Sequence, residues 1–144
     1  MITNIRHTGI VVSNMAKALD FWSAFRGFEI VIDQIEQGPF IDNLLGIENV
    51  IVRTVKMKTE SGNCLELLEF QSHPLQISSN LQPNTLGITH IALTVTDLNI
   101  TLSILKSMGY VPFGEPRKSQ DEKVKVVYIR VFEGVLLELV QEFS

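Results

Sequence analysis

Four polar side chains with the chemistry of metal ligands stand at matching positions in the two halves of the chain. His7 opens a short apolar run in the first half, and His90 opens a similar run in the second. Glu66 and Glu138 each lie between two leucines in closing Leu-Glu-Leu segments. Imidazole nitrogen and carboxylate oxygen together suit a borderline divalent metal such as Zn, Ni, Co, Fe or Mn. The order His, Glu, His, Glu therefore predicts one divalent metal per complete site.

The alternation of side chains along a strand places these four residues on one kind of surface. Successive strand residues point to opposite faces, so each glutamate points away from the leucines beside it. Each histidine shares its face with a very small residue, Gly9 or Ala92. A packed core would fill that space, whereas a ligand cavity needs it empty. A carboxylate among leucines is costly unless it is paired or metal-bound, which favours a metal site over a structural role.

The elements that must position the four residues form the same series in both halves. Each half begins with His and a strand, continues through Asn14 or Asp97 as a helix N-cap, and ends its helix at a glycine. A repeat of this length is typical of a duplicated half-domain and too long for a solenoid. For the first half we expect a helix ended by Gly27 in a left-handed C-cap, and strands over 5–12, 28–35, 50–59 and 64–70. For the second half we expect a helix over 98–108 ended by Gly109, and strands over 88–95, 110–114, 124–132 and 135–142.

Three segments between these elements carry separate expectations. Residues 71–87, with Pro74, Ser78, Ser79, Asn80 and Pro83, form a linker. Residues 36–49 form a loop with a short helical turn, whose apolar residues cover the cavity mouth or contribute to a dimer contact. Residues 115–123 mix charges of both signs and form either a mobile lid or a solvated hairpin.

Several conspicuous residues outside the fourfold pattern have ordinary interpretations. His73 has no counterpart in the other half, and we expect it to be an exposed loop residue. Cys64 shares the face of Glu66, and we expect it to be a small buried thiol. Glu69 is expected to be solvated, and Trp22, on the apolar stripe of the first helix, is expected in the core. Arg53 is interpreted as surface charge rather than as a contact for an anionic substrate.

Composition limits the classes of protein that fit. The chain has 144 residues, a length that suits one domain. Its net charge of −4 does not favour binding to nucleic acid. Its hydrophobic content of 45% supports a core and argues against disorder. A single cysteine excludes a disulfide framework and a thiolate-only zinc site. Neither a signal peptide nor a membrane span is visible, so a cytoplasmic protein without membrane contact is expected.

The paired His and Glu residues, together with the Leu-Glu-Leu closing strands, resemble the vicinal oxygen chelate superfamily over nearly the whole chain. That superfamily includes glyoxalase I, methylmalonyl-CoA epimerase, extradiol dioxygenases, and fosfomycin- and bleomycin-resistance proteins. The resemblance implies an α+β fold in which two βαβββ modules, residues 5–70 and 88–144 of a single domain 1–144, form a cupped, partly open mixed β-barrel. It also implies that the metal ligands are the first-strand and last-strand residues of each module, His7, Glu66, His90 and Glu138.

The same resemblance implies a chemical theme. Members bind a small molecule through two neighbouring oxygens, and a homodimer is expected. Glyoxalase I (lactoylglutathione lyase) and the epimerase move a proton next to a carbonyl through a metal-stabilised enolate. Either Glu138 or Glu66 would be the catalytic base, and the sequence does not choose between them. Nor does it choose whether one chain or two complete the site.

The substrate and two other functional classes stay open. Glutathione is a candidate co-substrate, and basic residues for its carboxylates or for CoA phosphates are available at Arg53, Arg117, Lys118, Lys123 and Lys125. One alternative is a metal-dependent extradiol-type dioxygenase. Another is a ligand-binding or antibiotic-resistance protein of the same fold. Glu66 as a fourth ligand argues against the dioxygenases and the fosfomycin enzymes, which use a reduced ligand set.

Overall fold

The computed structural model describes residues 1–76 and 82–143 of the chain. The chain divides into two compact units, Met1–Ile77 and Ser78–Ser144. The division falls within the segment 71–87 that was predicted to be a linker, and Ser78, Ser79 and Asn80 of that linker lie outside the described residues.

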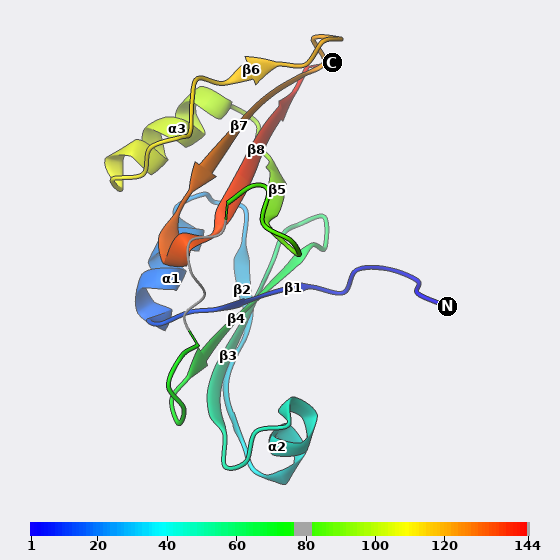
Figure 1. Ribbon diagram of the computed structural model, residues 1–144, viewed down its shortest axis with the longest axis vertical. Helices are drawn as coiled ribbons and strands as arrows, with labels where there is room; N and C mark the ends of the chain where they lie inside the picture. The colour runs from blue at the N-terminus through cyan, green and yellow to red at the C-terminus, as the bar shows by residue number, and fades with distance from the viewer. Residues whose placement is uncertain (77–81, 144) are drawn as a thin grey trace. The chain divides into compact units, whose positions relative to one another are not determined.

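The first unit contains one four-stranded mixed sheet and two helices (Figure 1). The strand order is β1-β4-β3-β2, with β1 parallel to β4 and the other neighbours antiparallel. Along the chain the elements are β1 (Thr8–Val11), α1 (Met15–Ser23), β2 (Glu29–Gln37), α2 (Pro39–Leu45), β3 (Ile51–Lys58) and β4 (Cys64–Phe70).

The second unit repeats this topology with strand order β5-β8-β7-β6. Again the first strand is parallel to the last one, and the remaining pairs are antiparallel. Its elements are β5 (His90–Thr94), α3 (Leu98–Ser107), β6 (Arg117–Lys118), β7 (Val124–Arg130), a 3-10 turn η1 (Phe132–Gly134) and β8 (Leu136–Glu142). The predicted α+β class with two βαβββ series is therefore confirmed.

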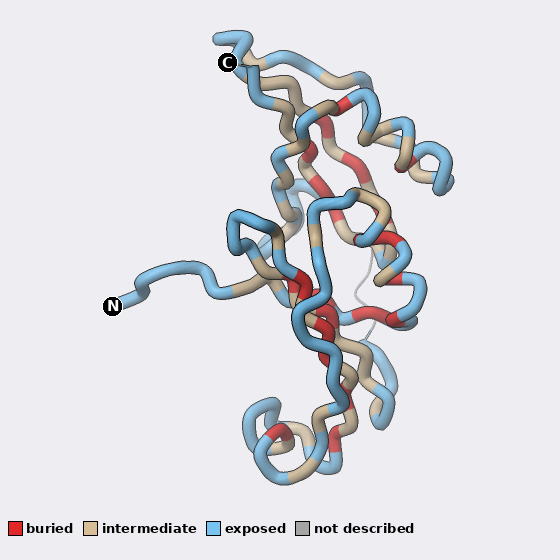
Figure 2. The backbone as a smooth tube through the Cα atoms, turned by 180° about the vertical axis from the view of Figure 1, so that it is seen from behind, coloured by how far each residue is buried: buried red, intermediate tan, exposed pale blue. Residues whose placement is uncertain are grey.

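Burial follows the predicted alternation of side chains in the strand that comes directly after His7. Ile10 and Val12 are buried, whereas Val11 on the opposite face is 48% exposed. In both units the buried residues run along the central strands (Figure 2). Helix α1 adds a buried face that includes the predicted core residue Trp22, and it contacts β4. The glutamate-bearing strands are thus held in place by leucines on the side away from the glutamates.

The predicted helix caps are confirmed, but one predicted helix end is wrong. Asn14 Oδ1 accepts the Lys17 N–H at 3.0 Å, and Asp97 Oδ1 accepts the Ile100 N–H at 2.9 Å. Gly109 is left-handed, with φ 90°, as expected for the end of α3. The left-handed residue after α1 is Arg26, with φ 49°, and not Gly27. Helix α1 stops early, at Ser23, so the reversal of the chain comes one residue before the glycine.

The predicted strand over 110–114 is also wrong. Those residues contribute only one isolated bridge, from Pro112 to Ile129, and the edge strand is β6 instead. Proline has no N–H to donate to a ladder, and it interrupts the pairing in the middle of the predicted strand. Strand β6 lies inside the segment 115–123 and pairs with β7, which begins directly after that segment. This pairing fits the hairpin alternative for residues 115–123.

The loop 36–49 contains the expected helical turn as α2. The carboxylate of Asp42 closes the loop by accepting the N–H groups of Asn49 and Val50 at 3.0 and 2.9 Å. Phe40 and Leu44 remain 77% and 67% exposed. Within the described residues, no helix is long and apolar enough to cross a lipid bilayer.

The prediction that Glu69 is solvated is wrong, because its side chain holds the start of α1. Glu69 Oε1 accepts the Met15 N–H at 2.8 Å. In the second unit Gln141 Oε1 accepts the Leu98 N–H in the same way, at 2.9 Å. The first N–H groups of a helix have no partner within the helix, and a neighbouring strand supplies one here. Each helix is thereby tied to the strand that carries its unit's glutamate.

We expect Glu69→Ala to lower the free energy of unfolding by about 1 kcal/mol, the usual effect of removing a helix-capping acceptor. Urea unfolding followed by circular dichroism measures the change. Glu60→Ala, in the exposed turn between β3 and β4, is the matched control and should leave the value within about 0.5 kcal/mol of the wild type. Equal stabilities for the two variants would contradict a capping role.

Candidate metal centre

The first unit brings together two of the four predicted ligands. His7 directly precedes β1, and Glu66 lies on the neighbouring strand β4, opposite Gly9. The Nε2 atom of His7 lies 3.1 Å from Oε2 of Glu66. The two side chains are 31% and 15% exposed, so both are accessible from solvent but partly shielded from it.

A lysine completes this first pair. Lys56 stands directly opposite Glu66 on β3, and its Nζ lies 3.1 Å from Oε1 of Glu66. Glu66 therefore meets an imidazole at one oxygen and an ammonium group at the other.

The second unit brings together the other two predicted ligands. His90 begins β5, Glu138 lies on the parallel strand β8, and His90 Nε2 is 3.1 Å from Glu138 Oε2. Thr89 Oγ1 lies 2.9 Å from Nδ1 of His90. A hydroxyl that accepts from Nδ1–H leaves the lone pair on Nε2, which is the tautomer that a metal ligand needs.

Tyr128 completes the second pair. It stands directly opposite Glu138 on β7, donates its hydroxyl proton to Glu138 Oε2 at 2.9 Å, and lies 3.3 Å from His90 Nε2. Burial raises the pKa of the Tyr128 hydroxyl, and the hydrogen bond to Glu138 and the charge of that carboxylate raise it further. Tyr128 is consequently a neutral hydrogen-bond donor at physiological pH.

The spacing within each pair fits ligation of a metal ion. Two ligand atoms at right angles, each about 2.1 Å from one ion, are about 3.0 Å apart. Both His–Glu pairs have 3.1 Å between nitrogen and oxygen, so each could supply two neighbouring ligands with little movement. Among its described residues, neither unit alone assembles three His, Cys, Asp or Glu side chains into a metal shell. A complete shell requires both pairs, and their meeting at one ion stays a prediction.

Lys56 and Tyr128 are the two neighbours that reasoning from the sequence missed. Both face a glutamate across a hairpin, and the turns of these hairpins, Glu60-Ser61-Gly62 and Glu133-Gly134, were predicted. Counting outward from Glu60-Ser61-Gly62 by equal numbers of residues leads from Glu66 to Lys56. The same count from Glu133-Gly134 leads from Glu138 to Ile129 instead, because the observed turn also includes Phe132. The hairpin register therefore signalled Lys56 but not Tyr128.

The other candidate polar residues lie apart from the two pairs. Arg53 forms a bidentate contact with Asp33 at 2.9 and 2.7 Å, which is in keeping with its interpretation as surface charge. The hydrogen bond from Arg53 holds the pKa of Asp33 below its usual value. His73 Nδ1 lies 2.7 Å from Ser72 Oγ in the segment after β4. Cys64 is half-buried at the start of β4.

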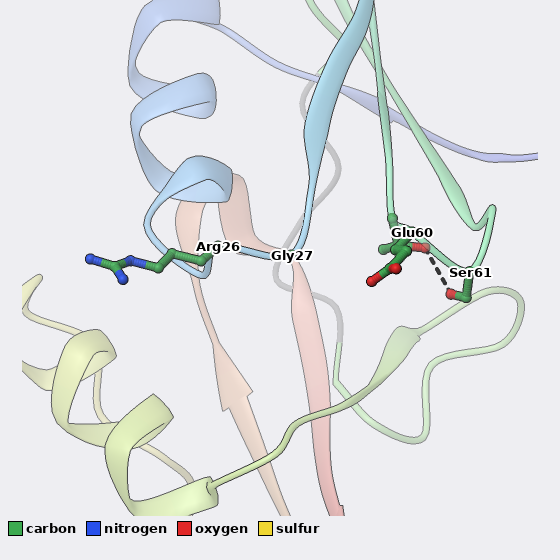
Figure 3. A pocket seen from close by; sticks show the side chains of 5 residues that line it. Arg26, Gly27, Glu60 and Ser61 are labelled. Carbon is green, nitrogen blue, oxygen red and sulfur yellow. Dashed lines mark hydrogen bonds between the residues drawn. The ribbon is translucent and has the colours of Figure 1, made fainter.

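An open hollow of about 490 Å³ in the first unit does not include the predicted ligands. It lies between the turn after α1 and the hairpin turn that joins β3 to β4, where Thr59 Oγ1 and Ser61 Oγ are 2.9 Å apart (Figure 3). Its lining residues are Arg26, Gly27, Thr59, Glu60 and Ser61.

Comparison with known proteins identifies the family. A sequence model of the Glyoxalase/Bleomycin resistance protein/Dioxygenase superfamily matches residues 6–128. The chain belongs to this superfamily. Its matched region includes His7, Glu66 and His90, and it ends ten residues before Glu138. None of the curated protein sequences compared with the chain matches it.

Solved structures support the superfamily fold. A glyoxalase family protein from Bacillus cereus is 25% identical with a TM-score of 0.91, and the alignment covers 100% of this chain and 97% of that one. A glyoxalase family protein from Enterococcus faecalis is 23% identical with a TM-score of 0.63, covering 95% and 96%. A fosfomycin resistance protein from Listeria monocytogenes, complexed with Mn(II) and 1S,2S-dihydroxypropylphosphonic acid, is 16% identical with a TM-score of 0.63, covering 96% and 90%.

Proposed function

We propose that this superfamily member is a divalent-metal-dependent enzyme that moves a proton next to a carbonyl group of a small substrate, as glyoxalase I and methylmalonyl-CoA epimerase do. The observation that carries the proposal is the pair of matched His–Glu contacts, each 3.1 Å, one in each unit. Partly buried carboxylates that touch imidazoles at matching positions of two repeated strands offer the donor set of a metal site. The superfamily relative with Mn(II) supports the choice of a divalent ion.

The ligands of the ion would be His7, Glu66, His90 and Glu138. When bound, a divalent ion supplies Lewis-acid stabilisation for negative charge on two neighbouring substrate oxygens. Thr89 orients the His90 ring through Nδ1, and Tyr128 holds one oxygen of Glu138 beside the same ring. The contact with Thr89 pre-arranges the His90 ring as a ligand before a substrate arrives.

The proton step belongs to a carboxylate of the chain. One glutamate takes the proton from the carbon next to the carbonyl, and the electrons of the broken C–H bond move toward the carbonyl oxygen. The resulting carboxylic acid then returns the proton to the neighbouring carbon in an isomerisation, whereas an epimerisation requires a second protonated group on the opposite face of the same carbon. In the isomerisation the carboxylate ends the cycle ionised, and no other reactant is consumed.

The test combines metal analysis with solvent isotope exchange. We expect the purified protein to contain about one divalent metal per complete site, and to incorporate solvent deuterium into the methylglyoxal–glutathione hemithioacetal or into methylmalonyl-CoA. Metal removal by a chelator should abolish the exchange, and adding the metal back should restore it. Oxygen uptake with a catechol would instead favour a dioxygenase. Metal-dependent consumption of fosfomycin, or tight drug binding by a metal-free protein, would favour a resistance protein.

The proposal includes a homodimer, as the superfamily resemblance implies. Sedimentation velocity would show a species of about twice the chain mass of 16.2 kDa.

A further inference from the structure

The two candidate ligand glutamates have different neighbours at equivalent positions. Lys56 faces Glu66 on β3, and Tyr128 faces Glu138 on β7. Both glutamates also lie 3.1 Å from a histidine. The difference between an ammonium group and a phenol therefore separates the two halves of the proposed centre.

Glu66 is held at both of its oxygens. His7 contacts Oε2, and Lys56 contacts Oε1, both at 3.1 Å. The carboxylate is 15% exposed and the Lys56 side chain is 27% exposed, so solvent screens this ion pair less than it screens a surface pair. If the Glu66 carboxylate turned away from His7, it would also break its charge-assisted contact with Lys56, which is partly shielded from solvent.

Glu138 is held at one oxygen only. His90 and Tyr128 both contact Oε2, and within the described residues no hydrogen bond or ion pair reaches Oε1. The bond from Tyr128 comes from a neutral hydroxyl, so it lacks the attraction between two full charges that the Lys56 ammonium group adds at Glu66. The Glu138 side chain is also 25% exposed, compared with 15% for Glu66. Rotation of this carboxylate away from the histidine therefore breaks weaker contacts.

We propose, on the basis of the proposed function, that Lys56 is a positioning residue that fixes Glu66 as a permanent metal ligand, which leaves Glu138 as the mobile carboxylate that transfers the proton. Lys56 would act on a bound ion only through Glu66, because it contacts Oε1 and leaves Oε2, next to His7, available as a ligand atom. This assignment decides between the two glutamates that the sequence leaves equivalent.

The first test measures Co(II) affinity by competition with a chromophoric chelator. Loss of a residue that orients a metal ligand weakens binding about 10- to 100-fold, and we expect that loss for Lys56→Met. Lys56→Arg keeps the charge next to Glu66 and should recover most of the affinity. Lys58→Met is the matched control, because it removes the same charge two residues along the same strand, on the same face and from an exposed position. Its affinity should stay within about 3-fold of the wild type, since long-range charge is screened.

The second test compares the two glutamates directly. Glu66→Gln should lose more Co(II) affinity than Glu138→Gln, because the fixed ligand contributes to every bound state and the mobile one does not. This comparison stands even if Lys56→Met folds poorly, and far-ultraviolet circular dichroism checks the fold of each variant.

The outcomes separate this inference from the function on which it rests. A wild-type protein that does not bind Co(II) overturns both. A wild-type protein that binds Co(II), with equal losses for Lys56→Met and Lys58→Met or with a larger loss for Glu138→Gln than for Glu66→Gln, overturns only the role of Lys56.

Discussion

Replacing Glu138 by glutamine is expected to slow deuterium exchange at the substrate carbon by about 10²- to 10⁴-fold, the usual contribution of a positioned general base. Glutamine keeps the shape of the side chain and accepts the Tyr128 hydroxyl proton through its amide oxygen, but it does not take a proton from carbon. The exchange is measured by mass spectrometry on whichever of the hemithioacetal and methylmalonyl-CoA the wild type labels. Metal content is measured on the same samples, and we expect most of it to remain.

Two further variants make this result specific. Glu142→Gln removes the same charge from an exposed position four residues further along β8, and it should exchange at the wild-type rate. Glu66→Gln should lose activity because it loses its metal, so excess Co(II) should restore part of its exchange rate. Excess Co(II) should not raise the exchange rate of Glu138→Gln. If the metal-loaded Glu138→Gln variant exchanges as fast as the wild type, Glu138 is not the base. If both glutamine variants keep the activity, the whole proton-transfer mechanism fails.

The sequence singled out the candidate site residues because the same pattern occurs twice. A lone histidine at a strand start has many ordinary explanations, and His73 illustrates one of them. The agreement of His7 with His90, and of Glu66 with Glu138, removes most of those explanations, because chance does not reproduce a register. The strand that carries Glu66 was predicted with its observed limits, 64–70. The structure adds what one-dimensional spacing does not contain, namely the two 3.1 Å contacts within the units.

The mispredictions have two different physical causes. The residues next to Glu69 in the sequence suggest a solvated side chain. Its hydrogen-bond partner, the N–H of Met15, lies 54 residues earlier in the chain. The strand predicted over 110–114 has suitable apolar residues at Val111 and Phe113, which the structure leaves 72% and 51% exposed. Propensity favoured a strand there, but the proline between them removes a ladder donor, and pairing resumes only at β6.

Truncation of Trp22 to alanine is expected to lower the free energy of unfolding by about 3–5 kcal/mol, the range for removing a large aromatic side chain from a core. The side chain is 1% exposed and packs edge-on against Phe21 and Phe28, with ring centroids 5.2 and 5.8 Å apart. Its loss would leave a cavity beneath α1, the helix whose first N–H group, that of Met15, is tied to β4 through Glu69. Urea unfolding followed by circular dichroism measures the effect.

The matched control is Phe40→Ala, which removes an aromatic side chain from the same unit at a position that is 77% exposed. We expect that variant to remain within about 0.5 kcal/mol of the wild type, since surface substitutions away from special features have small effects. A loss below about 1 kcal/mol for Trp22→Ala would contradict the packing of α1 on the sheet. Because Trp22 is the only tryptophan in the chain, its fluorescence in the wild type reports the unfolding of the core under α1. A fluorescence transition at a different urea concentration from the circular dichroism transition would show that the core under α1 unfolds separately from the rest of the chain.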